Sequence, residues 1–163
     1  MPQVNKVLVT TDFSEASKTG VRYGLEVAAS WHAEAVVLHI GDYREALSGP
    51  VSDADAPTRS HYESLPEFIE ERKKILERFL KDNFSDLTGN LNVEKVVTVG
   101  VPHEEIVEQA EKLGVDLIVM STHGRTGLRH MLIGSVTEQV VRRAHCPVLS
   151  IKQGVASAKD ARI

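Results

Sequence analysis

Two kinds of segment alternate along the chain, and they differ in the spacing of their hydrophobic residues. Short runs that are mostly apolar and rich in β-branched residues predict buried strands. These runs cover 6–10, 35–40, 93–99, 117–121 and 148–151. Between them lie longer segments in which apolar residues recur every three or four positions, as on a helix with one buried face. The predicted helices cover 14–31, 66–84, 102–113 and 135–144.

Strand followed by helix, repeated along the chain, is typical of an α/β domain. The near-continuous apolar strands predict a parallel sheet that is covered on both faces. We therefore expect one doubly wound five-stranded domain over residues 1–152, and a length of 163 residues suits one domain. Residues 41–63 are rich in Gly, Pro, Ser and Asp and predict a long loop, and the small, polar residues 153–163 predict a disordered tail.

Several helix ends carry chemical markers. Pro102 suits a first helical position, and Gly114 suits the residue that ends the same helix. The tetrapeptide 135–138 has the pattern of a capping box, in which Ser135 accepts from a first-turn amide while Glu138 reaches back to the amide of Ser135.

Composition and charge narrow the functional classes. A net charge of −4 weighs against nucleic acid as a partner. The longest apolar runs fall far short of the ~18 residues of a membrane span, and the first residues lack a signal-peptide pattern, so we expect a cytoplasmic protein without a membrane partner. Cys146 is the single cysteine, which is consistent with a reducing compartment, and we expect its thiol to be buried.

The segment between the fourth strand and the last helix carries the clearest chemical signal. Gly124 and Gly134 would let the backbone approach an anion, and helix-terminal amides near Ser135 and Thr137 suit phosphate oxygens. The alternative interpretation is that Ser135 is only a helix cap and the glycines only form turns. The segment is not a Walker loop, because it lacks that pattern and contains no lysine.

The pattern Ser121-x2-Gly124-x9-Gly134-Ser135 resembles the G-x2-G-x9-G-[ST] loop of ATP-binding universal stress proteins, with serine in place of the first glycine. The hydroxyl of Ser121 would either add a phosphate donor or crowd the ligand. The resemblance continues outside the loop, at 9–14, 38–40, 99–106 and 146–151. It covers nearly the whole chain except the loop at 41–63 and the tail.

This resemblance implies a strand order of 3-2-1-4-5 and binding of an adenine nucleotide, ATP or AMP, with or without Mg²⁺. The implied contacts lie at the carboxyl ends of strands or just beyond, where open parallel sheets bind ligands. The residues implied for adenosine are Thr10, Thr11, Asp12 and Ile40, those for the ribose and phosphate path are Met120, Ser121, His123 and Gly124, and those for the phosphates are Gly134, Ser135, Val136 and Thr137. Arg125 would either clamp a γ-phosphate or stay solvated.

Three functions remain open from the sequence. We expect foremost a sensor or switch of the stress response that binds nucleotide, forms a homodimer through its last strand at 148–151 and acts on an unknown protein partner. The others are a slow ATPase or phosphotransferase and a dimeric stress protein that binds no nucleotide. Asp116 lies at the amino end of its strand, roughly 13 Å from Ser121, too far to hold Mg²⁺ at the phosphates.

Overall fold

The computed structural model describes residues 3–42, 46, 64–122 and 134–152. Strands and helices alternate over this range. In chain order they are β1 (Lys6–Thr11), α1 (Glu15–Trp31), β2 (Glu34–Gly41), α3 (Leu65–Thr88), β3 (Val93–Val99), α4 (Pro102–Lys112), β4 (Leu117–Ser121), α5 (Ser135–Arg143) and β5 (Val148–Ile151). Most of the expected loop, the expected tail, and the candidate residues His123, Gly124 and Arg125 lie outside the described residues.

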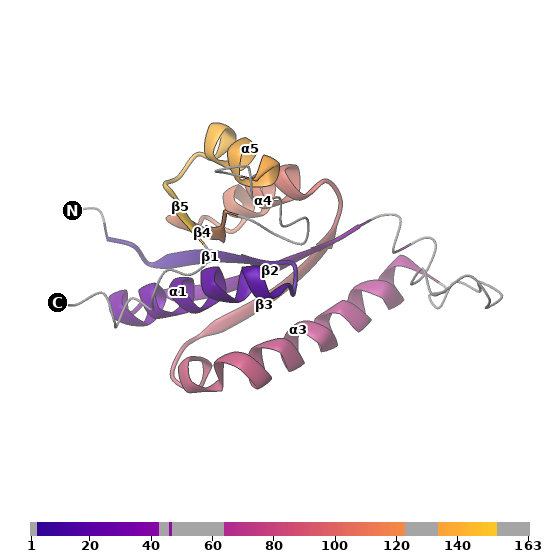
Figure 1. Ribbon diagram of the computed structural model, residues 1–163, viewed down its shortest axis with the longest axis horizontal. Coiled ribbons are helices and arrows are strands. Elements are labelled where there is room, and N and C mark those ends of the chain that lie inside the picture. Colours follow the sequence, from indigo (N-terminus) through magenta and orange to yellow (C-terminus); the bar gives the residue numbers. More distant parts are fainter. Residues whose placement is uncertain (1–2, 43–45, 47–63, 123–133, 153–163) are drawn as a thin grey trace.

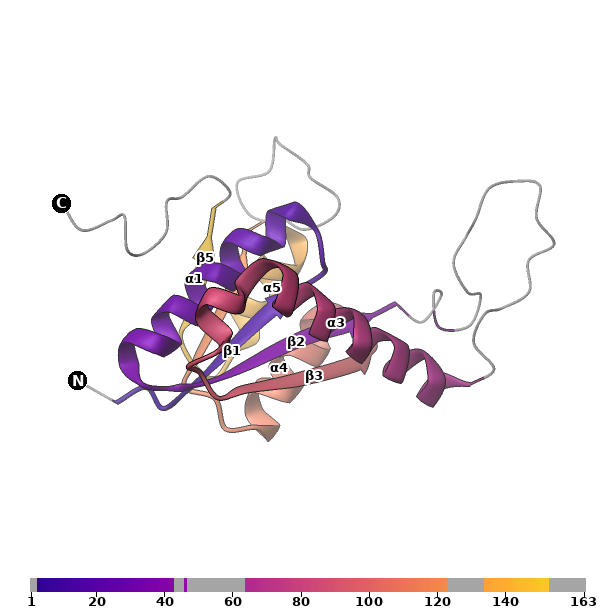
Figure 2. The same ribbon diagram turned by 90° about the horizontal axis from the view of Figure 1, so that it is seen from below.

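The strands form one five-stranded sheet with the order β3-β2-β1-β4-β5, and every neighbouring pair is parallel. The prediction of a doubly wound α/β domain with the order 3-2-1-4-5 is confirmed. In Figure 1, α1 and α3 lie below the sheet and α4 and α5 lie above it. Figure 2 shows α1 and α3 side by side across the face that they share. β1 is central in the sheet, so its carboxyl end lies between those of β2 and β4.

Both faces of the sheet are buried because successive residues of each strand point to opposite faces. Val7 and Val9 of β1 belong to the apolar cluster beneath α1 and α3. Leu8, between them, belongs to the cluster beneath α4 and α5. All three are fully buried, which accounts for the near-continuous apolar strands in the sequence.

The end of α3 differs from the prediction. The expected end at residue 84 is a kink, where Phe84 has the non-helical dihedral angles φ −141° and ψ 22°, and the helix continues to Thr88. Arg22 of α1 bonds both carboxylate oxygens of Asp86 and the carbonyl of Asn83 just beside the kink. This long-range contact, which the sequence spacing does not reveal, holds the last turn of α3 against α1.

One expectation about burial needs correction. Cys146 was expected to be buried and is only half-buried, because it lies just before the edge strand β5. Trp31, the last residue of α1, is 51% exposed. Within the described residues, no helix is long and apolar enough to cross a bilayer.

Candidate functional site

The candidate site lies where β1 and β4 end side by side. The chain passes from β1 through α1 to β2 on one side of β1, whereas β4 lies on its other side. Such a reversal of strand order leaves a crevice beyond the carboxyl ends of the strands, which is where open α/β sheets bind ligands. The turn from Thr11 to Ser14 follows the carboxyl end of β1, and the first turn of α5 is hydrogen-bonded to the end of β4.

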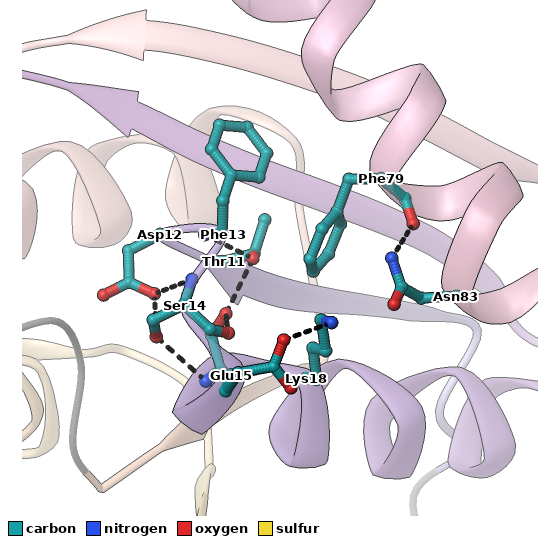
Figure 3. Close-up of polar contacts among 9 residues, drawn as sticks. Thr11, Asp12, Phe13, Ser14, Glu15, Lys18, Phe79 and Asn83 are labelled. Carbon is teal, nitrogen blue, oxygen red and sulfur yellow. Dashed lines mark hydrogen bonds and ion pairs between the residues drawn. The ribbon is translucent and has the colours of Figure 1, made fainter.

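Side chains within the β1–α1 turn satisfy the amides of that turn (Figure 3). The amide of Phe13 donates to Thr11 Oγ1 over 3.1 Å, and the amide and hydroxyl of Ser14 both donate to Asp12 Oδ1, over 3.0 and 2.6 Å. Ser14 Oγ in turn accepts from the amide of Ser17 and caps α1. Asp12 is therefore held by its own neighbours and remains half-exposed at the carboxyl edge of the sheet.

Phe13 adopts the left-handed backbone conformation, with φ 64°. For a residue that carries a Cβ this conformation costs about 1–2 kcal/mol. The ring of Phe13 stacks on His39, with 4.0 Å between ring centroids, and meets the edge of the Phe79 ring at 5.4 Å. His39 Nδ1 lies 3.0 Å from the carbonyl oxygen of Thr11, and because that oxygen only accepts, Nδ1 carries the proton.

The sequence-based site did not include Phe13 and His39. Both lie in segments that carried the family resemblance, but their contact joins the turn after β1 to β2 and cannot be read from spacing. The one local sign in the sequence is an aromatic residue within an Asp-x-Ser turn, where the side chains of Asp and Ser bond the backbone.

The start of α5 is fixed to the end of β4 by two hydrogen bonds. The amide of Gly134 donates to the carbonyl of Thr122 over 2.8 Å, and Thr137 Oγ1 donates to the carbonyl of Ser121 over 3.1 Å. A Cβ at position 134 would lie 2.7 Å from the Thr122 oxygen, so only glycine allows this approach. The hydroxyl of Thr137 is thus used within the fold.

The predicted capping box at Ser135 is wrong. Gly134 is the N-cap of α5, and no side chain caps this end of the helix. Ser135 is the first helical residue and is exposed, while the Glu138 carboxylate binds Arg142 one turn later. The bond from Gly134 to Thr122 sets where the helix begins, one residue earlier than Ser135 would have set it. Within the described part of the chain, the amides of Ser135, Val136 and Thr137 consequently have no acceptor.

Ser121 fits the fold by turning toward α1. Its hydroxyl donates to the carbonyl of Ala16 over 3.0 Å. A Cβ at Gly20 would lie 2.5 Å from Ser121 Oγ, so the serine occupies space that a glycine in α1 leaves open. Left-handed backbone among the described non-glycine residues occurs only at Phe13 and His32, so residue 121 does not require glycine for its backbone conformation. The hydroxyl is engaged by α1 and does not project into the crevice.

The remaining described candidates separate into buried and accessible residues. Thr10, Thr11 and Met120 are buried, and the Thr11 hydroxyl also contacts Ser17 Oγ at 3.0 Å. Ile40 and Val136 are half-buried against the core on the α4 and α5 face. All of the described candidates lie at the carboxyl ends of β1, β2 and β4 or at the start of α5.

Asp116 lies at the opposite end of β4. Its Oδ2 accepts from the amides of Asn5 and Lys6, over 2.8 and 3.0 Å, and so ties β4 to the start of β1. The described residues contain no group of three or more His, Cys, Asp and Glu side chains that could hold a metal ion.

The chain is a parallel α/β domain, and uncapped helix amides lie beside the point where its strand order reverses. Domains of this class are suited to binding small anionic ligands. Residues 3–152 match the model of the Universal stress protein family, and the chain belongs to that family.

Individual relatives agree with this assignment. The chain is 34% identical to Universal stress protein MJ0577 of Methanocaldococcus jannaschii over 153 residues, which cover 91% of this chain and 94% of that protein. The solved structure of MJ0577 matches with a TM-score of 0.68 and 32% identity, covering 95% of this chain and 100% of the other. Universal stress protein YxiE of Bacillus subtilis is 32% identical over 151 residues, covering 91% of this chain and 99% of that protein.

Proposed function

We propose that this universal stress protein binds an adenine nucleotide, ATP or AMP, in the crevice between β1 and β4 and acts as a sensor or switch in the stress response. The observation that carries the proposal is the uncapped start of α5. Three successive amides there lack an acceptor in the described part of the chain, and a glycine N-cap holds them beside the end of β4. Phosphate oxygens satisfy such amides and are favoured by the positive end of the helix dipole.

Two structural relatives support an adenine nucleotide as the ligand. One is a universal stress protein in complex with cAMP, 22% identical, and the other is the universal stress protein from Archaeoglobus fulgidus in complex with dAMP, 21% identical. Both ligands combine adenine, a ribose-type sugar and one phosphate.

The proposed contacts divide the ligand between the two borders of the crevice. The amides of Ser135, Val136 and Thr137 bind phosphate oxygens, together with His123, Gly124 and Arg125, which lie between β4 and α5 in the sequence. The β1–α1 turn lies on the other border, so Asp12 accepts from a hydroxyl of the sugar or from a base donor. Ile40, half-buried at the end of β2, packs on the adenine. Thr11 and Thr137 contribute by fixing the backbone of the two borders.

A thermal shift assay tests this proposal. A ligand that binds only the folded protein adds about 2.7 kcal/mol at 100 times its Kd. For a domain of this size that stabilisation should raise Tm by about 5 to 10 °C. We expect this rise with AMP or ATP, and a smaller rise with tripolyphosphate, which lacks the adenosine. Unchanged Tm with millimolar AMP and ATP would contradict the proposal.

We also propose that two copies of the chain pair through β5. This strand is at one end of the sheet order, so its outer backbone groups face away from β4. A short apolar edge strand is a site of unwanted pairing unless it is covered, and a twofold contact satisfies both copies. The substitution L149K should give a folded monomer of 17.9 kDa in light scattering. V101K is the control, since Val101 is 46% exposed and follows the strand at the other end of the sheet. A wild-type monomer at tens of micromolar would contradict dimerisation.

A further inference from the structure

We infer that Phe13 and His39 are positioning residues that hold the β1–α1 turn, and with it Asp12, in its binding conformation before any ligand arrives. The inference rests on the proposed nucleotide site. Neither residue is expected to touch the ligand. His39 acts on Asp12 through Thr11, which precedes it, and Phe13 acts on it as the residue that follows.

The carbonyl of Thr11, on one side of Asp12, is fixed by β2. His39 Nδ1 donates to that carbonyl over 3.0 Å, and His39 is only 1% exposed. A buried imidazole held by its neighbours has little freedom to turn away. The peptide that enters the turn is therefore attached to the strand beside it.

Phe13, on the other side of Asp12, is fixed by its ring. The ring stacks on His39 at 4.0 Å and meets Phe79 of α3 at 5.4 Å, so it lies between side chains from β2 and α3. Figure 3 shows the Phe13 side chain extending from the turn, with Phe79 near it on α3. These contacts keep the backbone of Phe13 at φ 64°, a conformation that a phenylalanine rarely adopts without support.

The conformation matters because it sets where the Asp12 carboxylate lies. Asp12 Oδ1 accepts from the amide of Ser14, the residue after Phe13, so the carboxylate follows the backbone angle at position 13. If Phe13 relaxed to an ordinary right-handed conformation, the amide of Ser14 and the carboxylate would move together. A ligand would then have to restore the turn, and its apparent Kd would rise by the inverse of the fraction of molecules with the correct turn.

Two substitutions at one position separate positioning from packing. F13A removes the ring but keeps a Cβ in the left-handed region, whereas F13G removes the same ring and accepts that region freely. We expect F13A to bind AMP about tenfold more weakly than wild type in calorimetry, as when a tenth of the molecules hold the turn. F13G should bind several-fold more tightly than F13A although it is no more stable to heat.

The control is F84A, which removes a buried phenylalanine whose ring meets Phe79, whereas the described ring contacts of Phe13 are with His39 and Phe79. It should lower Tm and leave the affinity for AMP unchanged at a temperature where circular dichroism shows a folded protein. The inference is overturned if F13A binds AMP as tightly as wild type, or if F13G binds no better than F13A.

A measurement on the wild-type protein keeps the inference testable even if the variants fail to fold. In NMR spectra without nucleotide, the imidazole protons of His39 should already show ring-current shifts from Phe13, and adding AMP should leave those shifts in place. Shifts that arise only with saturating AMP would show that the ligand forms the turn, and would overturn the inference. Absence of AMP and ATP binding by the wild type would instead reject the proposed function, whatever the state of the stack.

Discussion

The two ends of the sheet differ in how their polar groups are used. At the amino end, polar groups pair with one another. Asp116 accepts from the backbone amides of Asn5 and Lys6, and the Glu34 carboxylate accepts from the Lys6 ammonium and from Nδ2 of the Asn92 side chain. At the carboxyl end, the amides that begin α5 have no acceptor within the described residues. At the amino end the polar groups are used to join the strands, while at the carboxyl end the backbone amides of α5 are left without an acceptor among the described residues.

The difference teaches that an empty volume and a set of unbonded donors are separate signs of a binding site. A cavity of about 760 Å³ lies at the amino end, lined by Asn5, Glu34, Asp86 and Asn92 among others. Its two carboxylates are already bonded, Glu34 to Lys6 and Asp86 to Arg22. The site proposed at the carboxyl end rests instead on backbone amides that have no acceptor within the described residues.

The largest loss of affinity for AMP is expected from G134A, which changes the N-cap of α5 at the carboxyl end of the sheet. The new Cβ would lie 2.7 Å from the Thr122 oxygen, so the start of α5 must shift and its amides lose their alignment. Loss of about two charge-assisted hydrogen bonds should weaken AMP binding by about 100-fold in calorimetry.

The matched control for this variant is G89A. Gly89 has an ordinary helical conformation, with φ −65°, and a Cβ there would lie 3.6 Å from its nearest neighbour. The control should keep full affinity and either keep or slightly raise stability. Equal binding by G134A and wild type would remove the start of α5 from the site.

D116A, at the amino end, is expected to lower stability and leave the affinity for AMP nearly unchanged. Removing the shared acceptor leaves the amides of Asn5 and Lys6 without it, which should cost about 1–2 kcal/mol of unfolding free energy in urea titrations. Affinity for AMP should stay within about twofold of wild type, because the site lies at the far end of β4. A loss of affinity as large as that of G134A would break the contrast between the two ends.

The smallest effect concerns the thiol at the amino end. Burial raises the pKa of Cys146, and the Asp116 carboxylate raises it further. D116N removes the negative charge, so the pKa of the thiol should fall and more thiolate should be present at pH 8. We expect alkylation by iodoacetamide to accelerate by about twofold, since a solvent-screened charge acts weakly. Unchanged or slower alkylation, with D116N folded, would show that Asp116 does not act on Cys146.

The strands were predicted well because their apolar runs are local, whereas their order was implied by the family resemblance. β3, β4 and β5 have the expected bounds, and β1 and β2 are longer by one or two residues at their ends. A parallel sheet buried on both faces imposes an apolar run on each strand, and such runs are visible without any partner. The candidate residues lie at the carboxyl end of the sheet, as strand direction alone predicts, and that they form a binding site stays a prediction.

What the sequence did not predict depends on contacts between distant segments. Ser135 has the composition of an N-cap, but the bond between Gly134 and Thr122 moves the cap one residue earlier. The left-handed turn at Phe13 depends on a ring from β2 and another from α3. The last turn of α3 is bonded by Arg22, which lies 64 positions before its partner Asp86. None of these contacts leaves a periodic trace in the sequence.

Gly20 of α1 allows the backbone of β4 to pass close to the helix. A Cβ at position 20 would lie 2.5 Å from Ser121 Oγ and 2.9 Å from the backbone nitrogen of Ser121. The second contact is with backbone, so position 20 requires glycine whichever residue stands at 121. The space that this requirement leaves beside the strand end is where the Ser121 hydroxyl lies, bonded to the carbonyl of Ala16. Any transfer of this strand end into a related scaffold therefore has to carry the glycine of α1 along.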